Sequence, residues 1–309
     1  MNVSVFLPEG SLYGTIANSN SLRSIASLEE ARKEKYILEA RAVLCDAQHN
    51  LIVDLGFTQG VIPREEGAIG ITEGYTRDIA IISKVNKAVC FIVTGFRRRA
   101  DDSLEPILSR RAAQQECIDG YISTLRSGEV ISAKVTHLEP FGAFVDIGCG
   151  LPSLIPIDQI SISRISHPAD RFAVGDNIYA IVKSIDDNGR VFLSHKELLG
   201  TWTENAELFR AGETVGGIIR SIEDYGVFVE LTPNLAGLAE PFDNVRVGQN
   251  ASVYIKNIIP EKMKIKLIIV DAFDAQYSTP PIRYFITDGM LNRWIYSPEK
   301  SPKLIETIF

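Results

Sequence analysis

A repeat of about 20 residues, present twice without a gap, constrains this chain more than any other feature. Residues 128–147 read GEVISAKVTHLEPFGAFVDI, and residues 212–231 read GETVGGIIRSIEDYGVFVEL, at an offset of 84. Residues 174–177 (VGDN) then match residues 247–250 (VGQN) at an offset of 73. The difference of 11 between the two offsets means that the second copy lacks 11 residues of the segment PIDQISISRISHPADRFA.

A third, weaker copy lies upstream. Residues 40–56 (ARAVLCDAQHNLIVDLG) match 132–148, and residues 107–111 (ILSRR) match 192–196 (FLSHK). This copy has His49 and Ile52 where the middle copy has Phe141 and Phe144. The chain therefore contains three units of one kind, of which the first lacks an aromatic pair.

Each unit alternates apolar and polar residues with the period of a β-strand, as in residues 131–136 (ISAKVT). Asp187–Gly189 (DNG) lies between two such runs and predicts a hairpin. Five short strands in about 75 residues predict a small closed barrel or a sandwich.

The hydrophobic period changes to that of a helix between the units. Residues 112–125 and 194–209 carry apolar residues at helical spacing, which predicts helical connectors. Near the start, Ser27 with Glu30 resembles a capping box and predicts a helix that begins there and runs to about Tyr36.

Composition and motifs exclude several classes of protein. The net charge of −7 argues against a carrier that holds nucleic acid by bulk charge. The start MNVSVFLPEGSL does not resemble a secretory signal, and no apolar run reaches the 18 residues of a membrane span. The four cysteines form no C-x-x-C pair and are interpreted as small core residues in a reducing cytoplasm: Cys45, Cys90, Cys117 and Cys149.

No enzyme signature accompanies the repeats. The phosphate loop, the dinucleotide fingerprint, the nucleophile elbow and the H-E-x-x-H motif are all absent. The four histidines, His49, His137, His167 and His195, do not fall at metal-ligand spacing. We therefore expect no metal, no cofactor and no enzyme, although a site assembled across units stays open.

Large aromatic residues fall on the outer face of two predicted strands. Val145 and Ile147 face the core, so the period of two places Phe144 outside beside Asp146. Gly142 permits a bulge that brings Phe141 to the same surface. Tyr225, Gly226 and Phe228 repeat the arrangement in the third unit. Such rings stack on the bases of single-stranded nucleic acid, or they pack against a neighbouring unit or linker.

At this point the runs GxVxxxxVxxLxxFGAFVDIG, VGDxIxAxVxxID and GRVFLSxK resemble the S-one RNA-binding domain, an oligonucleotide-binding-fold (OB-fold) module. The resemblance implies a mainly β protein of three tandem five-stranded OB-fold barrels joined by helical linkers. The expected organisation is an N-terminal segment with a helix (1–35), a divergent domain (36–112), a helical linker (113–125), a typical domain (126–200), a helical linker (201–209), a trimmed domain (210–271) and a C-terminal extension (272–309).

The resemblance also implies the RNA-binding residues. The family's aromatic pair corresponds to Phe141 and Phe144 and to Tyr225 and Phe228. The further RNA-binding positions that the resemblance implies are Lys134, Lys183, Asp186, Arg190 and Lys264. The family's histidine is replaced by Pro156 and Glu240, and Pro260 lies near the lost acid of the third unit.

Two further segments carry specific expectations. The run Arg97–Arg99, followed by Asp101 and Asp102, is interpreted as a solvated hairpin turn, with a phosphate-binding turn as the alternative. Asp288-Gly289 predicts a second hairpin, with Trp294 packed onto the third unit.

The sequence thus predicts a cytoplasmic protein that binds single-stranded RNA, either mRNA or rRNA, in translation or RNA metabolism. The second and third units carry the binding, and the first is a structural or protein-contact module. The alternative is a scaffold that docks on the ribosome or a ribonuclease through protein contacts.

Overall fold

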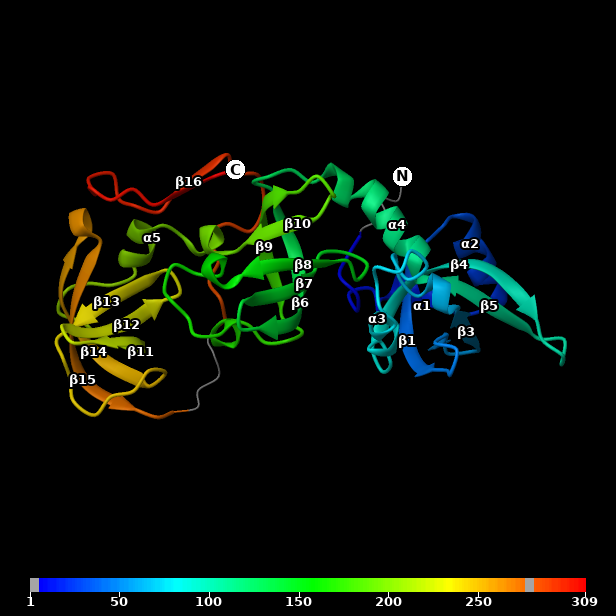
Figure 1. Ribbon diagram of the computed structural model, residues 1–309, viewed down its shortest axis with the longest axis horizontal. Helices are drawn as coiled ribbons and strands as arrows, with labels where there is room; N and C mark the ends of the chain where they lie inside the picture. Colours follow the sequence, from blue (N-terminus) through cyan, green and yellow to red (C-terminus); the bar gives the residue numbers. More distant parts are fainter. Residues whose placement is uncertain (1–5, 276–280) are drawn as a thin grey trace. The chain divides into compact units, whose positions relative to one another are not determined.

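The computed structural model describes residues 6–275 and 281–309, and these residues form three closed five-stranded barrels (Figure 1). Residues 1–5 lie outside this range. They are part of the start of the sequence, on which the expectation of no secretory signal depends. Two compact units are present: residues 1–125 with 146–152, and residues 126–145 with 153–309. The predicted mainly β fold of three tandem barrels is confirmed.

Barrel 1 has the strand order β1-β2-β3-β5-β4. Its strands are β1 (Leu38–Cys45), β2 (Leu51–Asp54), β3 (Gln59–Ile62), β4 (Ala88–Arg98) and β5 (Leu104–Ser109). Its predicted arginine turn is confirmed as a hairpin turn neutralised by nearby acids, since Arg98 pairs with Asp102 at 2.5 Å. Arg97 and Arg99 both pair with Glu105, which the sequence had not indicated.

Barrels 2 and 3 repeat this architecture. The strands of barrel 2 are β6 (Val130–Glu139), β7 (Gly142–Asp146), β8 (Pro152–Pro156), β9 (Asn177–Ile185) and β10 (Val191–Ser194). Those of barrel 3 are β11 (Thr214–Glu223), β12 (Gly226–Thr232), β13 (Leu235–Ala239), β14 (Asn250–Ile259) and β15 (Lys264–Phe273). The predicted hairpin at Asp187–Gly189 joins β9 to β10.

Each barrel closes through one short parallel contact between its third and fifth strands. Val61 pairs with Ile107 in barrel 1, and Leu154 pairs with Phe192 in barrel 2. In barrel 3, Leu238 pairs with Lys266 and Ala239 with Leu267. All other neighbouring strands whose register is given are antiparallel, so these contacts convert a meander into a closed barrel.

The helices lie partly where the sequence predicted them. They are α1 (Ile16–Ser21), α2 (Ile25–Lys33), α3 (Ile79–Ile82), α4 (Arg110–Gly120) and α5 (Trp202–Ala206). The 3-10 turns are η1 (Arg64–Glu66), η2 (Ile122–Thr124), η3 (Ile157–Gln159), η4 (Pro168–Asp170), η5 (Lys196–Leu199) and η6 (Pro260–Lys262).

Two helix predictions were wrong in detail. The cap of α2 is Ser24, whose hydroxyl accepts from the Ser27 amide, so Ser27 lies in the first turn rather than at the cap. Residues 194–209 do not form one helix, because Gly200 adopts a φ of 83° and separates η5 from α5. A real capping box, Thr201 with Glu204, begins α5.

The C-terminal extension forms a small sheet of its own, in which β16 (Arg293–Ile295) pairs with β17 (Glu306–Ile308). The hairpin predicted at Asp288-Gly289 was wrong, because the partner of β16 lies downstream of it. The predicted packing of Trp294 is confirmed: it is buried in the same core as Val227, Val229 and Leu267 of barrel 3.

The segment of barrel 2 that barrel 3 lacks packs directly against barrel 3. The Ser163 amide donates to the Pro233 carbonyl at 3.0 Å, and the Ile162 amide donates to Asn234 Oδ1 at 3.0 Å. Further along the segment, Arg171 forms a buried ion pair with Glu230 of β12. The extra residues therefore serve as the contact surface between two barrels of the same compact unit.

Glu230 is the shared acceptor of this contact, because Arg220 also pairs with it at 2.9 Å. The side chains of Arg171, Arg220 and Glu230 are all more than nine-tenths buried. We expect Glu230→Ala to lower the unfolding free energy by about 3–5 kcal/mol, because it leaves the buried Arg171 guanidinium without its ion-pair partner and leaves Arg220 only the carboxylate of Asp170. Urea unfolding measures this. The exposed Glu261→Ala is the control, and equal stability of the two variants would contradict the prediction.

Candidate nucleic-acid interface

The corner between β6 and β7 presents two phenylalanine rings on the outside of barrel 2. Phe141 is 56 % exposed and Phe144 is half-buried. Their centroids lie 5.9 Å apart at an interplanar angle of 88°, which is an edge-to-face contact. Gly142 allows this corner, because a Cβ there would lie 2.5 Å from the Ile155 carbonyl oxygen. The prediction that both rings share one surface is confirmed.

Two further rings lie on the outside of barrel 2 and were not among the candidates that the sequence indicated. The His137 centroid lies 6.3 Å from that of Phe144. Phe192 is half-buried on β10 between the buried Val191 and Leu193, so it points outward. The signal was available, because the same period of two that placed Phe144 outside also places Phe192 there.

The predicted polar residues of barrel 2 do not form one cluster. Asp186 accepts from the amides of Asn188 and Arg190 at 2.9 and 2.8 Å, so it holds the hairpin turn that carries Arg190. Lys183 precedes this hairpin on β9. Lys134 pairs with Asn177 at the other end of β9, roughly 20 Å from Lys183 along the strand.

The position of Asp146 contradicts the expectation that it lies on the outer face beside Phe144. Asp146 does not lie outside but is buried, because its carboxylate accepts from the amides of Glu9, Gly148 and Gly150. Burial raises the pKa of this carboxyl to about 6. The strand ends at Asp146, so the alternation that holds for Phe144 no longer applies there.

Barrel 3 repeats the aromatic corner with different surroundings. Tyr225 is 65 % exposed, and its ring meets that of Phe228 edge to face, with centroids 6.2 Å apart. A Cβ at Gly226 would collide with the Ala239 carbonyl oxygen, so this position also depends on glycine. Phe228 is opposite Leu238, which in turn is opposite Lys266, so an aromatic, an aliphatic and a basic side chain follow one another across three strands.

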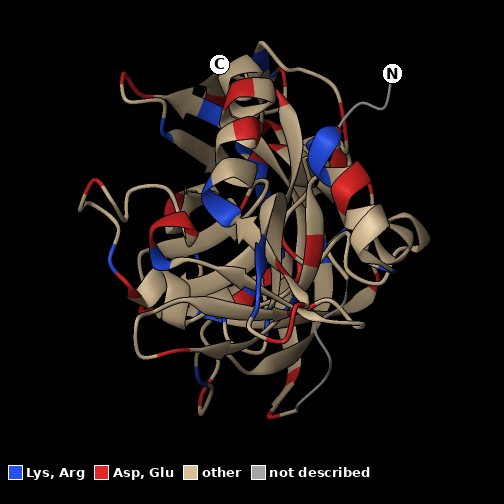
Figure 2. Cartoon of the chain, turned by 90° about the vertical axis from the view of Figure 1, so that its right-hand side faces the viewer, with Lys and Arg blue, Asp and Glu red and all other residues tan. Residues whose placement is uncertain are grey.

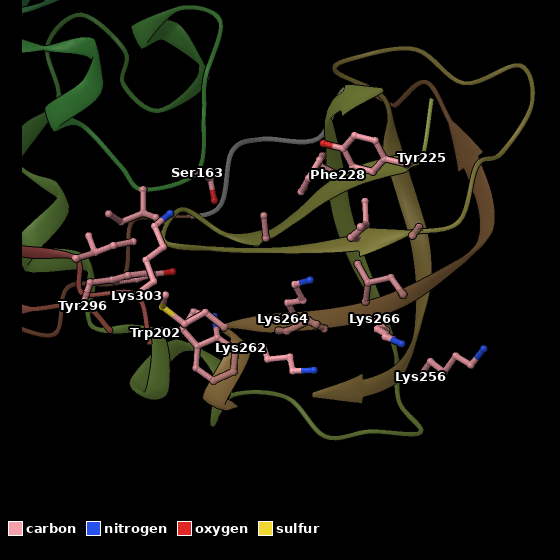
Figure 3. Close-up of a pocket in the computed structure, with 18 of the residues that line it drawn as sticks. Ser163, Trp202, Tyr225, Phe228, Lys256, Lys262, Lys264, Lys266, Tyr296 and Lys303 are labelled. Carbon is pink, nitrogen blue, oxygen red and sulfur yellow. The ribbon is translucent and has the colours of Figure 1, made fainter. Parts of the chain in front are cut away.

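A groove of about 780 Å³ covers this face of barrel 3, and Tyr225 and Phe228 line it. Figure 3 shows the two rings on one side of the groove, with lysines across from them. The predicted Lys264 lines it, whereas the following lining lysines were not predicted: Lys256, Lys262, Lys266 and Lys303. The run KMKIKL over residues 262–267 shows lysines at the period of a strand and could have identified two of them.

The predicted departures from the family pattern are visible in the structure. Pro156 ends β8, and Glu240 is exposed at the rim of the groove, where its carboxylate lies 3.8 Å from Lys256 Nζ. The nearby His195 does not substitute, because it is buried with its Nδ1 2.8 Å from the Ile160 carbonyl oxygen. Burial lowers the pKa of His195 to about 4, which keeps the ring neutral.

Barrel 1 lacks the aromatic corner, as predicted. At the equivalent position, His49 Nδ1 lies 3.0 Å from Asp78 Oδ2, and Ile52 lies on β2. In the described part of the chain no group of three or more histidine, cysteine or acidic side chains is placed to hold a metal ion. None of its helices is both long and apolar enough to span a bilayer.

Charge is mixed over the chain as a whole. Figure 2 shows Lys and Arg interspersed with Asp and Glu, which agrees with the net charge of −7. Any attraction for a polyanion therefore depends on local groups such as the groove lysines.

The exposed position of the rings predicts how their removal affects folding. Phe144→Ala is expected to lower the unfolding free energy by about 1 kcal/mol, since it removes mainly ring–ring contacts. Ile155→Ala, at a fully buried position of the same barrel, is expected to cost about 2–5 kcal/mol. Thermal and urea unfolding compare the two variants. If Phe144→Ala is as destabilised as Ile155→Ala, Phe144 belongs to the core.

Comparison with known proteins is consistent with this geometry. A family model described as "S1 RNA binding domain" matches residues 124–196, which is the barrel 2 region that the sequence assigned to the S-one domain. The chain is 29 % identical over 231 residues to small ribosomal subunit protein bS1 of Leuconostoc lactis, covering 70 % of this chain and 52 % of that protein. It is 30 % identical over 258 residues to the bS1 homolog of Bacillus subtilis, covering 81 % and 63 %.

Among solved structures, a multidomain protein with nucleic acid binding domains from Streptococcus pneumoniae is similar over 77 % of this chain and 74 % of that one. Its sequence identity is 15 % and its TM-score 0.26, so the fold assignment depends on the strand pairing described above. The chain spans between half and two thirds of the length of the two bS1 relatives, whose names describe ribosomal proteins rather than enzymes. The chain therefore contains an S1 RNA binding domain over residues 124–196 and is homologous to small ribosomal subunit protein bS1.

Proposed function

We propose that the chain binds single-stranded RNA on the outer faces of barrels 2 and 3, in connection with translation. The observation that carries this proposal is the repeated aromatic corner. Phe141 with Phe144, and Tyr225 with Phe228, each form an edge-to-face pair with one ring more than half exposed. Exposed aromatic pairs on a barrel strand cost free energy in water unless a ligand covers them.

Base stacking explains why the rings are exposed. Every base has an apolar face, so a ring that stacks on it contributes about 1–3 kcal/mol per base without reading sequence. In barrel 3 the rings line a groove together with lysines, which supplies phosphate contacts beside the stacking surface. This combination favours RNA binding over the scaffold alternative, for which the rings would be buried between units.

The finer parts of the proposal follow from the family. The RNA is mRNA or rRNA, the site residues are those of the two aromatic faces, and the ribosome or an RNA-processing enzyme is a further partner. A cytoplasmic location, the absence of an enzymatic activity and the predicted domain limits (36–112, 126–200 and 210–271) remain predictions that belong to the same proposal.

Barrel 1 supports a second, separate role as a protein-contact module. It has no aromatic corner, but it exposes Tyr75 at 71 % and Ile79 at 64 % between β3 and β4. Apolar side chains that are exposed close together mark interaction surfaces, and protein contacts are among these.

Stacking requires unpaired bases, so the protein should prefer unstructured RNA to a duplex. We expect a labelled oligouridylate to bind at least tenfold more tightly than an RNA duplex of equal length, because bases in a duplex are not free to stack on the rings. Fluorescence anisotropy at one fixed salt concentration measures both. Equal affinity for the two ligands would contradict the proposal.

The two aromatic faces should act together on a long RNA. Phe144→Ala and Phe228→Ala are each expected to weaken binding by about 1–3 kcal/mol, and the double variant more than either, because two linked sites reinforce each other when both engage. On an oligomer too short to reach both barrels, a change in one barrel should leave the other site unchanged. Titration of short and long oligouridylates measures this.

The control is His49→Ala, in the barrel without the aromatic corner, which is expected to leave affinity unchanged for both lengths. If both phenylalanine variants fold normally and bind long RNA as well as the parent does, the scaffold alternative replaces RNA binding.

A further inference from the structure

The strand registers allow a position-by-position comparison of the two RNA-binding faces. Ser184 pairs with Phe192 in barrel 2, and Asn257 pairs with Lys266 in barrel 3. These pairs occupy the same place in the two barrels, since Ile185 with Val191 and Ile258 with Ile265 follow them. Lys266 therefore occupies the place that the ring of Phe192 occupies in barrel 2.

The neighbouring positions differ in the same direction. Lys264 replaces Arg190, and Lys256 corresponds to Lys183. With Lys266, barrel 3 thus has three cations at these positions where barrel 2 has two. The turn between β14 and β15 is one residue longer than its counterpart in barrel 2 and carries Lys262. Barrel 3 also has fewer rings at the compared positions. It keeps its corner pair, but Lys266 stands in the place of Phe192 and Ser221 in the place of His137.

The lysines of barrel 3 are concentrated in one place. Residues 210–271 contain four lysines, and all four line the groove. The C-terminal extension adds Lys303, and among the residues that the structure describes Glu240 is the only acidic one that lines the groove. Within the described residues no carboxylate lies within 4.0 Å of the ammonium groups of Lys262, Lys264, Lys266 or Lys303.

Such clustering is costly unless a polyanion neutralises it. Five ammonium groups around one groove repel one another, and each is a compact, strongly hydrated charge that suits a phosphate better than a base. None of the three arginines of residues 210–271 lines the groove, and two of them have acidic partners: Arg220 pairs with the buried Glu230 and Arg246 with Asp274. The groove is thus a local cationic site in a chain whose net charge is negative.

We propose that the two barrels divide the work of binding: barrel 3 supplies most of the phosphate contacts from its lysine groove, with Lys303 of the C-terminal extension as part of the site and with its own aromatic corner beside the lysines, whereas barrel 2 holds the RNA mainly by stacking on its bases. This inference rests on the proposed function and adds the chemical moiety that each barrel recognises.

The test compares salt dependence, which counts phosphate contacts, with affinity, which includes stacking. The groove variant is the triple change Lys262→Gln, Lys264→Gln and Lys266→Gln. Its binding to a long oligouridylate should depend less on salt, with the slope of log K against log[KCl] reduced by about 2, because each lost phosphate contact on a single strand contributes about 0.7. The stacking variant, Phe144→Ala with Phe192→Ala, should lose about tenfold in affinity or more at every salt concentration and keep the slope of the parent.

Inorganic polyphosphate provides the second probe, because it carries the charges of RNA without bases. The parent and the stacking variant should bind it equally, whereas the groove variant should bind it at least tenfold more weakly. A separate change, Lys303→Gln, should reduce both polyphosphate binding and the salt slope in the same direction as the triple variant, but by less.

A matched control removes the same net charge elsewhere. Lys33, Lys35 and Lys87 are exposed in the unit that does not contain the groove, and changing all three to Gln should leave the salt slope for oligouridylate and the affinity for polyphosphate unchanged. If this control lowers the slope as much as the groove variant does, bulk charge explains the effect and the division of work is wrong. It is also wrong if the stacking variant reduces the slope as much as the groove variant does.

The outcomes separate this inference from the proposed function. A parent that binds RNA, with a groove variant of unchanged slope and unchanged polyphosphate binding, overturns the inference and leaves RNA binding in place. A parent that binds polyphosphate through the groove but binds no oligouridylate overturns the proposed function, and the division of work with it.

Discussion

The parallel contact that closes each barrel is the constraint on which the candidate site depends. In barrel 3 the pairing of Leu238 with Lys266 joins β13 to β15. As a result only β13 separates β12, which bears Phe228, from β15, which bears Lys264 and Lys266. An open meander of the same sequence would leave β12 and β15 at unrelated positions. Closure by two residue pairs thus creates a surface on which apolar rings and ammonium groups are neighbours.

The same closure in barrel 2 produces a different chemistry, because the residue that forms the parallel contact from the fifth strand is of a different type. Leu154 pairs with Phe192 there, so the row across β8 and β10 is apolar throughout. The backbone frame is therefore shared, and the side chains on its outward positions determine what the face can bind. Inward positions do not differ in this way, since both barrels fill them with aliphatic residues such as Val145 and Val229.

The sequence was sufficient for the strands and for the aromatic corners, because a period of two and a glycine next to an aromatic residue are local signals. The choice of closed barrels over a sandwich came from the resemblance to the S-one domain. It was insufficient where the outcome depends on tertiary contacts. Asp146 is at an outward position by period but is buried by three amide donors that include the distant Glu9. Lys303 lines the groove only because the C-terminal extension packs on barrel 3. Lys264 and Lys266 form an intermediate case, since their spacing was visible but their shared groove was not.

The 11 residues by which the two repeats differ have a consequence for how the chain can be divided. Glu230 and Asn234 of barrel 3 find their partners in residues 162–171 and 196–200 of the preceding repeat. Trp202, Trp294 and Tyr296, all outside residues 210–271, complete the core of barrel 3. A fragment cut at the ends of the repeat would keep the Arg220 partner of the buried Glu230 but lose its Arg171 partner, and its hydrophobic core would be open. The unit that was duplicated in the sequence is therefore smaller than the unit that folds.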